Sequence, residues 1–333
     1  MHRQKFLINI KHKNKHLNIM KKVFFKGCAA MLLFTTTACS QTPQPSQPPT
    51  STDVRINEAN FPDAKLRQYL SEQPYGSDGV ITPAEFAQIK VIIIEGLGVA
   101  DLKGIKYFTA LEELHARHNQ IKSFDFSGMK SLKILLMGGN QLTSINVSGL
   151  TNLQSLYCSN NQLTSINVSG LTNLEYLYLS ANQFTSVDVS SLSKLIELYL
   201  GNNRFVSLNL SNLKNLVHLD LFNNLLKSID VSALKNLQRL YCDRNELTSL
   251  NLTGLSKLTE LECDNQAPKL KLNASGGNYS VNITLNNPAG FTDGISYANG
   301  TLTSTSSAIK ESYFEVQTGY GSTKLSGIMS FSY

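Results

Sequence analysis

The sequence predicts a β-rich solenoid, in which short parallel strands stack into a gently curved arc between a small helical cap and a C-terminal antiparallel β unit. Two observations in the 333-residue chain predict this fold. A leucine recurs every 21 residues without an insertion, at Leu111, Leu132, Leu153, Leu174, Leu195, Leu216, Leu237 and Leu258. An asparagine follows it in all but the last copy, at Asn119, Asn140, Asn161, Asn182, Asn203, Asn224 and Asn245. A fixed period in this range is typical of stacked repeats, because one repeat cannot bury its apolar side alone.

The copies that contain the asparagine follow the phrase L-x-x-L-x-L-x-x-N-x-L, with another apolar residue or a cysteine at some of the leucine places; this phrase is the signature of leucine-rich repeats. In the copy that begins at Leu174, Leu177 and Leu179 are two residues apart, as neighbours on one face of a strand must be. The recurring asparagine is expected to satisfy backbone groups at a buried turn. Serines and β-branched residues in the return segment favour extended or 3₁₀ structure over an α-helix. We assign residues 89–266 to the repeats, beginning with a 22-residue opening copy.

The positive charge of the chain belongs to its first residues. The chain has 30 basic and 24 acidic residues, but residues 1–38 carry eight of the basic ones and no acidic one, which leaves 22 basic against 24 acidic. This distribution removes the main support for nucleic-acid binding. From Met20, an alternative start, a basic segment, a short apolar run and small residues precede Cys39. That order is typical of a secretory signal.

The same segment resembles the signal of bacterial lipoproteins, and the resemblance implies that Cys39 becomes the lipidated first residue of the mature protein. The alternative is an ordinary cleaved signal with a chance cysteine. Residues 39–52 carry four prolines and, after Cys39, no apolar side chain. This composition predicts a disordered tether that holds the folded part away from a membrane.

Residues 53–88 predict two helices around a loop, which would form a helical cap over the open end of the core. Asn60 is placed to cap a first helix that begins near Pro62. Thr82 and Glu85 have the spacing of a capping box at the start of the second helix.

The loop between these helices resembles an EF-hand calcium loop, with Asp78 and Glu85 at two of the liganding places. Pro74 and Gly76 stand at two other places, where calcium needs oxygen ligands. Asp78 and Glu85 are therefore only a weak calcium candidate, and we expect the helical hairpin to serve as a plug without a bound metal.

Strand periodicity places the third, fifth and seventh residues of each repeat on the concave face. Tyrosine occupies the fifth place in four repeats, three of them consecutive, and a polar, charged group follows. Tyrosine offers rigid area with a polar tip and is common at binding hot spots. The alternative is that cross-strand tyrosine pairs only stabilise the sheet. The predicted ligand-binding residues are Tyr157, Tyr176, Tyr178, Tyr199, His218, Asp220, Phe222, Arg239, Tyr241, Asp243 and Glu262.

Three cysteines, Cys158, Cys242 and Cys263, occupy the sixth, inward place, where a cysteine acts as a small apolar filler. Cys242 and Cys263 fall on adjacent strands and are close enough for a disulfide, although strand geometry seldom aims inward thiols correctly. The sequence has no nucleophile elbow, phosphate-binding loop or zinc-binding helix. We therefore expect no catalytic residues and no cofactor.

The segments INEANFPD, YGSDGVIT, GIKYFTALEEL and NQLTSINVSGLTNL carry a family resemblance that extends from residue 53 to about residue 266. The pattern resembles internalin-like leucine-rich repeat proteins of bacterial surfaces, especially lipoproteins of Bacteroidetes. This resemblance implies a non-enzymatic adhesion or ligand-binding protein of the bacterial cell envelope. It would be an outer-membrane lipoprotein, either surface-exposed or periplasmic.

The repeat phrase stops at Gln266, and residues 267–333 are rich in Ser, Thr, Asn and Gly. Alternating apolar residues and an Asn299–Gly300 turn predict a small antiparallel β unit that covers the open end of the solenoid.

The leading functional hypothesis is a membrane-anchored recognition protein that binds a protein ligand through the concave tyrosine face. A protein ligand is favoured because solenoids present extended surfaces that match macromolecules. One alternative is a structural component of the envelope. Another is a glycan-binding protein for nutrient capture, with the glycan lying across the tyrosine rings.

Overall fold

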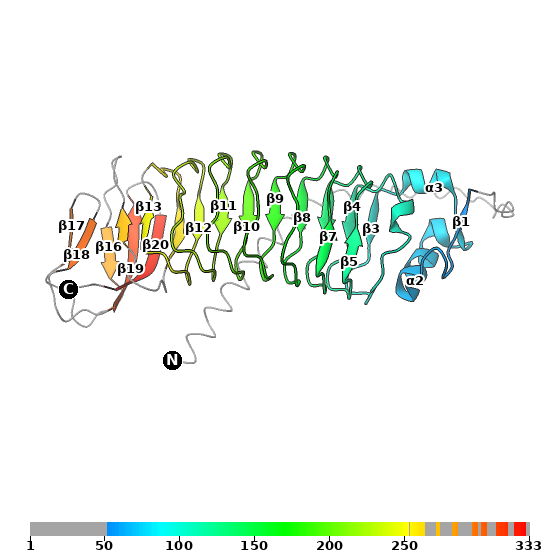
Figure 1. Cartoon of the computed structure of the whole chain (residues 1–333), viewed down its shortest axis with the longest axis horizontal. Coiled ribbons are helices and arrows are strands. Elements are labelled where there is room, and N and C mark those ends of the chain that lie inside the picture. The colour runs from blue at the N-terminus through cyan, green and yellow to red at the C-terminus, as the bar shows by residue number, and fades with distance from the viewer. Residues whose placement is uncertain are drawn as a thin grey trace, which may run out of the picture. The chain divides into compact units, whose positions relative to one another are not determined.

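The computed structural model describes residues 52–252 and 254–263, together with the strands at 271–273, 282–285, 295–298, 301–304, 311–318 and 323–330. Cys39, the leader and the tether lie outside these residues. Within them the chain is a parallel-strand solenoid with a 21-residue period, which confirms the fold that the sequence predicts (Figure 1).

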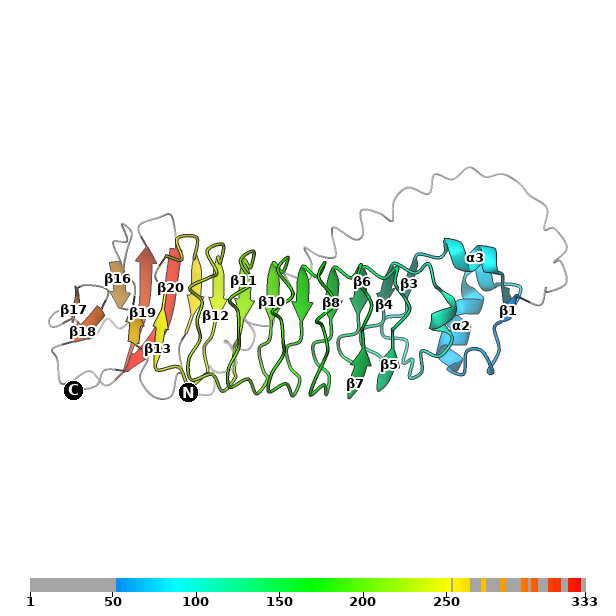
Figure 2. The same cartoon turned by 45° about the horizontal axis from the view of Figure 1, so that its top comes forward.

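One strand from each repeat contributes to a single parallel sheet, in which the strands lie side by side in sequence order (Figures 1 and 2). Each residue pairs with its equivalent 21 residues along the chain, so that Leu198 lies between Leu177 and Leu219. The strands are β3 (Val91–Ile93), β4 (Glu113–His115), β6 (Ile134–Leu136), β8 (Ser155–Tyr157), β9 (Tyr176–Tyr178), β10 (Glu197–Tyr199), β11 (His218–Asp220), β12 (Arg239–Tyr241) and β14 (Glu260–Glu262).

The core lies behind this sheet and consists of the inward residues of every repeat. Leu177 and Leu179, at the fourth and sixth places, are both fully buried, and their equivalents in the other repeats are buried too. The opening copy keeps the pattern, because Ile92, Ile94 and Val99 are also fully buried. Burial of apolar surface on this scale is the main favourable contribution to folding.

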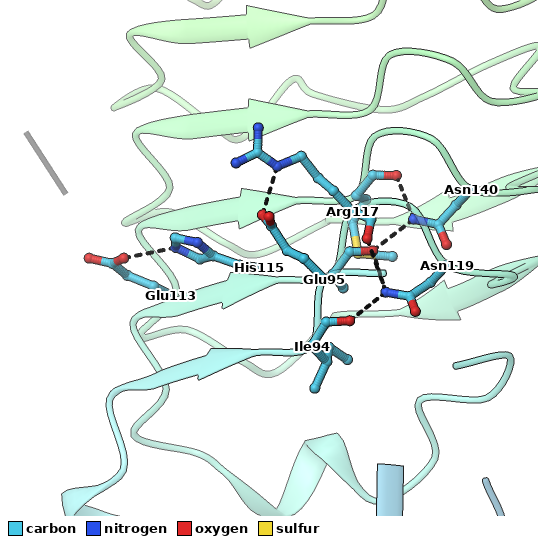
Figure 3. Close-up of polar contacts among 9 residues, drawn as sticks. Ile94, Glu95, Glu113, His115, Arg117, Asn119 and Asn140 are labelled. Atoms are coloured by element: carbon cyan, nitrogen blue, oxygen red, sulfur yellow. Dashed lines mark hydrogen bonds and ion pairs between the residues drawn. The ribbon is translucent and has the colours of Figure 1, made fainter. Parts of the chain in front are cut away.

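The recurring asparagines form the predicted ladder, and each one links two neighbouring repeats. The Nδ2 group of Asn119 donates to the carbonyl oxygens of Ile94, at 2.8 Å, and Ala116, at 3.1 Å (Figure 3). Its Oδ1 accepts from the Val99 N–H at 2.9 Å. Asn140 repeats this arrangement one copy later, donating to Ala116 and Met137 and accepting from Ile121. Each amide thus satisfies backbone groups that the buried turn would otherwise leave unpaired.

The residue before each ladder asparagine adopts a left-handed backbone conformation. This holds for Gly139, with φ of 69°, and for the non-glycine residues His118, Asn160, Ala181, Asn202, Asn223 and Arg244. Asparagine and glycine tolerate this conformation best. A Cβ atom added at Gly139 would lie 2.6 Å from the Nδ1 atom of His118, so this glycine also gives space to the neighbouring repeat.

The return segments are extended, as the sequence predicts, and they carry a second amide ladder. Two short parallel pairs form here, β5 (Ser123–Asp125) with β7 (Ser144–Asn146) and β13 (Ser249–Asn251) with β15 (Lys271–Asn273). In the last place of four repeats, an exposed asparagine amide donates to a backbone carbonyl of the preceding repeat. These residues are Asn152, Asn173, Asn215 and Asn236.

Two helices, α2 (Ala64–Glu72) and α3 (Pro83–Gln88), precede the sheet, together with the strands β1 (Val54–Arg55) and β2 (Val80–Ile81) and the 3₁₀ turn η1 (Pro74–Gly76). A second 3₁₀ turn, η2 (Ile105–Tyr107), lies in the opening copy. The predicted capping box at α3 is present, since Thr82 and Glu85 each bond the backbone N–H of the other.

The sequence-based prediction for the cap of α2 was wrong, because Asp63 takes this role instead of Asn60. One oxygen of Asp63 accepts from the N–H groups of Lys65 and Leu66, and the other accepts from Ala100 at 2.7 Å. Asp63 thereby joins the helix to the opening repeat. Burial works to raise the pKa of Asp63, but the backbone hydrogen bonds outweigh it and hold the pKa below its ordinary value. Asn60 donates to the Arg55 carbonyl oxygen instead.

The C-terminal strands include the predicted antiparallel pairs. Strand β16 (Asn282–Leu285) pairs antiparallel with β19 (Glu311–Thr318), which pairs antiparallel with β20 (Thr323–Ser330). Strands β17 (Ile295–Ala298) and β18 (Thr301–Ser304) form a separate antiparallel pair. In addition, β20 pairs in parallel with β14, so the repeat sheet continues into these strands. The backbone groups at the edge of β14 are therefore paired with β20.

The core cysteines Cys158, Cys242 and Cys263 are buried thiols, so Cys242 and Cys263 are not joined by a disulfide. Burial raises the pKa of the Cys158 thiol to about 12, as expected for an inert apolar filler. Among the described residues, no helix has both the length and the apolar character needed to cross a bilayer.

Replacing a ladder asparagine is expected to destabilise the protein strongly. Asn203→Ala would leave the buried Phe184 N–H and the Leu179 and Leu200 carbonyl groups without their side-chain partner. Since an unsatisfied buried group costs about 1–3 kcal/mol, we expect a loss of about 2–4 kcal/mol in the free energy of unfolding, measured with urea. The control is Asn215→Ala in the exposed ladder, which should cost about 0.5–1 kcal/mol. Equal losses would contradict the role assigned to the buried ladder.

Candidate functional site

The candidate site is the outer face of the parallel sheet, which the sequence analysis assigned to the concave side. We call it the sheet face, and it consists of the outward residues at the third, fifth and seventh places of the repeats. Because the strands pair in register, equivalent residues form rows across the sheet. All the predicted ligand-binding residues from Tyr157 to Glu262 occupy these rows.

Three tyrosines in the fifth row stack face to face on consecutive strands. The ring centroids of Tyr157 and Tyr178 are 4.2 Å apart, and those of Tyr178 and Tyr199 are 4.5 Å apart. The two pairs are nearly parallel, with interplanar angles of 12° and 7°. Tyr178 therefore has both ring faces covered by its neighbours.

This stacking corrects the expectation of an exposed aromatic platform. The exposed fractions of Tyr157, Tyr178, Tyr199 and Tyr241 are only 7%, 5%, 2% and 6%. Burial raises the pKa of all four hydroxyl groups, so they stay protonated. The rings therefore stabilise the sheet through cross-strand contact, which was the alternative interpretation. Tyr176, in the third row, is only half-buried.

Glu197 on β10 connects the tyrosine stack to the charged part of the sheet face. The Tyr178 hydroxyl donates to one carboxylate oxygen of Glu197, and His218 Nδ1 lies 3.1 Å from the other. The side chains of Glu197 and His218 are 14% and 17% exposed. Burial works to raise the pKa of Glu197, but the hydrogen bonds from His218 and Tyr178 outweigh it and keep the pKa below its ordinary value. Glu197 therefore remains ionised at neutral pH.

The rest of the charged group continues along the following strands. Arg239 Nε lies 3.3 Å from Glu260 Oε2, and both side chains are about one-third exposed. Asp220 is buried, which raises the pKa of its carboxyl to about 7, although the Phe222 N–H donates to it at 2.9 Å.

Three further predicted residues, Phe222, Asp243 and Glu262, lie at the outward places of the same strands or just after them. The guanidinium of Arg244 lies 5.2 Å from the centroid of the Phe222 ring, within the range of a cation–π contact. Asp243 is buried, whereas Glu262 is half-buried.

Ion pairs of the same kind occur at the other end of the sheet face. Arg117 Nε lies 2.8 Å from Glu95 Oε1, and His115 Nε2 lies 3.0 Å from Glu113 Oε2 (Figure 3). Glu95 and Arg117 come from adjacent repeats, whereas Glu113 and His115 share strand β4. Partly buried pairs of this kind orient charged side chains more than they add stability.

The weak calcium candidates lie in the helical cap, away from the sheet face. Asp78 accepts from the Val80 N–H at 3.0 Å, and the Glu85 carboxylate accepts from the backbone and hydroxyl of Thr82. Both carboxylates therefore hold the local backbone. No group of three or more His, Cys, Asp or Glu side chains in the described part of the chain could hold a metal ion.

Sequence reasoning missed two residues of this site, Glu197 and Glu260, although both stand at outward third places. Glu197 contacts Tyr178 diagonally and His218 directly across the strands. One feature of the sequence could have identified Glu197. When the repeats are aligned, this acidic residue is one strand away from both Tyr178 and His218.

Loss of the central ring is expected to destabilise the sheet. Tyr178→Ala would open a gap between Tyr157 and Tyr199 and remove the donor to Glu197. Removing a buried aromatic ring costs about 3–5 kcal/mol, so thermal unfolding should shift clearly downward. Tyr176→Ala, which removes a half-buried ring from the same strand, should cost about 1 kcal/mol or less. Unchanged unfolding of Tyr178→Ala would contradict the structural role of the stack.

Comparisons with known proteins agree with this fold. The sequence matches the family Leucine Rich repeats (2 copies) over residues 151–194 and the family Leucine Rich Repeat over residues 215–237. No curated protein matches it.

Two solved structures from Listeria monocytogenes are similar to the chain. An internalin (inlF) is 27% identical with a TM-score of 0.50, and the alignment covers 67% of this chain and 73% of the internalin. An internalin C2 (inlC2) is 24% identical with a TM-score of 0.50, covering 70% of this chain and 94% of that one. The chain therefore carries leucine-rich repeats in a fold similar to that of internalins.

Proposed function

We propose that this chain is a non-enzymatic recognition protein that binds a protein partner through the sheet face. The observation that carries this proposal is the third row, where five large and partly exposed side chains lie next to one another on consecutive strands. They are Tyr176, Glu197, His218, Arg239 and Glu260. The row includes a tyrosine and an arginine, which are residue types enriched at binding hot spots. The similarity to internalins supports a role in binding or adhesion.

A protein partner is favoured over a glycan because the tyrosine rings are not open for stacking. A sugar lying across the stack would need a free ring face, but both faces of Tyr178 contact other tyrosines. The side chains that remain accessible carry charges and hydrogen-bonding groups that match the surface of a folded protein or a peptide.

We also propose that the protein is anchored by a lipid on Cys39 in the bacterial cell envelope. The support for this part is the sequence alone, namely the basic and apolar leader, the small residues before Cys39 and the proline-rich tether. A tether of this composition would give the sheet face room to meet a partner.

The proposed partner site can be tested by capture from extracts of bacterial and host cell surfaces. The immobilised chain is compared with the double variant Tyr176→Ala, Arg239→Ala and with a matched control, Thr172→Ala, Lys214→Ala, whose residues are exposed outside the sheet face. We expect a partner captured by the wild type to be lost at least about tenfold in the first variant and retained in the control. Equal capture by all three proteins would reject the sheet face as the binding site.

The lipid anchor can be tested by growing bacteria that express the chain in labelled palmitate. Label should enter the wild-type protein and Cys28→Ser, which changes the other cysteine of the leader, but not Cys39→Ser. Absence of label from the wild type, or its persistence in Cys39→Ser, would refute the anchor.

A further inference from the structure

Formal charge is segregated between the sheet face and the rest of the repeats. The described repeat residues, 89–252 and 254–263, include 14 acidic and 15 basic side chains. Seven of the acidic residues are on the sheet face, namely Glu95, Glu113, Glu197, Asp220, Asp243, Glu260 and Glu262. Two arginines and no lysine share it, so with every carboxyl ionised its formal charge is −5, while the remainder of the repeats carries +6. Burial raises the pKa of Asp220 to about 7, so this carboxyl is only partly ionised at neutral pH. A surface of one sign attracts partners of the opposite sign over distances beyond contact.

The two basic side chains on the sheet face already have acidic neighbours. Arg117 pairs with Glu95 and Arg239 pairs with Glu260. Each of these pairs is close to neutral as a unit, so the net negative charge of the sheet face comes from the carboxylates outside the two pairs. The charge of Glu197 is also fixed in place, because Tyr178 and His218 hold its carboxylate in one orientation. Negative potential thus dominates the part of the sheet face that extends from β10 to β14.

The opposite end of the sheet face carries exposed apolar side chains beside two ion pairs, Glu95 with Arg117 and Glu113 with His115. Val91 and Ile93 on β3 are 43% and 38% exposed, and Ile134 on β6 is half-buried. Strands β3 and β14 are separated by all the intervening repeat strands, as Figure 2 shows for β3 and β12. Along the direction in which the repeats stack, the sheet face therefore changes from an end with exposed apolar side chains and paired charges, through the tyrosine stack, to a predominantly acidic end.

Between these two ends, the hydroxyl of Ser180 lacks a hydrogen-bond partner. Ser180 stands at the outward seventh place, in the row next to that of Tyr178, and it is only 7% exposed. A buried hydroxyl without a partner costs free energy in the unbound protein. A polypeptide lying along this row would bring backbone N–H and C=O groups that satisfy it. This observation is independent of the charges and also points to an occupant.

We infer that the sheet face takes a basic polypeptide, whose Lys or Arg side chains lie over β10–β14 and whose apolar side chains lie over β3–β6. This inference rests on the proposed function and names the chemistry and the orientation of its partner. A second copy of the chain is a poorer occupant, although its return side is basic. Several lysines there already bond their own chain, for example Lys106 with Asp125 and Lys194 with Asn173.

The test uses the full chain and a labelled synthetic peptide with a valine–serine block followed by a lysine–serine block, measured by fluorescence anisotropy. A second peptide carries glutamate in place of lysine. We expect saturable binding of the lysine peptide, at least about tenfold tighter than the glutamate peptide. Affinity should fall as ionic strength rises from about 0.01 M to about 0.15 M, because the Debye length shortens from about 30 Å to about 8 Å.

Two matched triple variants test which carboxylates attract the lysine peptide. Glu197→Gln, Glu260→Gln, Glu262→Gln should weaken binding of the lysine peptide about tenfold or more. Glu112→Gln, Glu175→Gln, Asp188→Asn, which neutralises three acidic residues outside the sheet face, should leave binding unchanged. Thermal unfolding is recorded for both.

The orientation of the bound peptide is measured on the wild-type chain, so this measurement does not require any variant to fold. A photo-crosslinker at the valine end of the peptide should attach within β3–β6, and one at the lysine end within β10–β14. Any one of four results would overturn the inference: equal binding of both peptides, no saturable binding, crosslinks in the opposite orientation, or salt-dependent self-association of the chain without peptide binding. The two proposals can also fail separately. Suppose that the double variant Tyr176→Ala, Arg239→Ala no longer captures a natural partner, but that neither salt nor the triple glutamine variant changes its capture. The proposed function then stands and this inference fails.

Discussion

The constraint on which the structure depends is the pairing of backbone groups at the buried turn of every repeat. The turn lies against the core, where water cannot satisfy N–H and C=O groups. An asparagine amide solves this with two donors and one acceptor, and it uses them on its own repeat and on the preceding one. Asn203, for instance, bonds Leu179 and Phe184 as well as Leu200. The 21-residue spacing has no exceptions between Leu111 and Leu258, and the 22-residue opening copy keeps the same bonds, because Asn119 still reaches Ile94 and Val99.

The solenoid, its inward rows and the asparagine ladder could be predicted from the sequence, because a fixed period converts equivalent positions into spatial neighbours. The burial of the tyrosine side chains could not be predicted in this way. An outward direction on a strand predicts exposure for a single ring such as Tyr176. Tyr157, Tyr178 and Tyr199 instead cover one another, because parallel strands lie about 4.8 Å apart, close to the spacing of stacked rings.

Contacts between distant parts of the chain were also beyond sequence reasoning. Asn60 and Asp63 are both good helix caps by residue type. The choice of Asp63 follows from its second carboxylate oxygen, which reaches Ala100 in the opening repeat, 37 residues away. In the same way, the importance of Glu197 follows from side-chain directions across three strands. The row itself follows from the 21-residue period, whereas the contacts of Glu197 with Tyr178 and His218 are seen only in the structure.

The reach of each buried amide has a consequence for how such a chain changes its length. Every ladder asparagine needs only the repeat before it, and every such repeat presents the same backbone groups at the same distance. Removal or duplication of one whole repeat between two of these asparagines would bring equivalent surfaces together. The new neighbouring repeats would then form the same hydrogen bonds as the original neighbours. Recombination between copies of the gene segment would thus lengthen or shorten the recognition surface by one strand at a time, and it would require no new contacts between repeats.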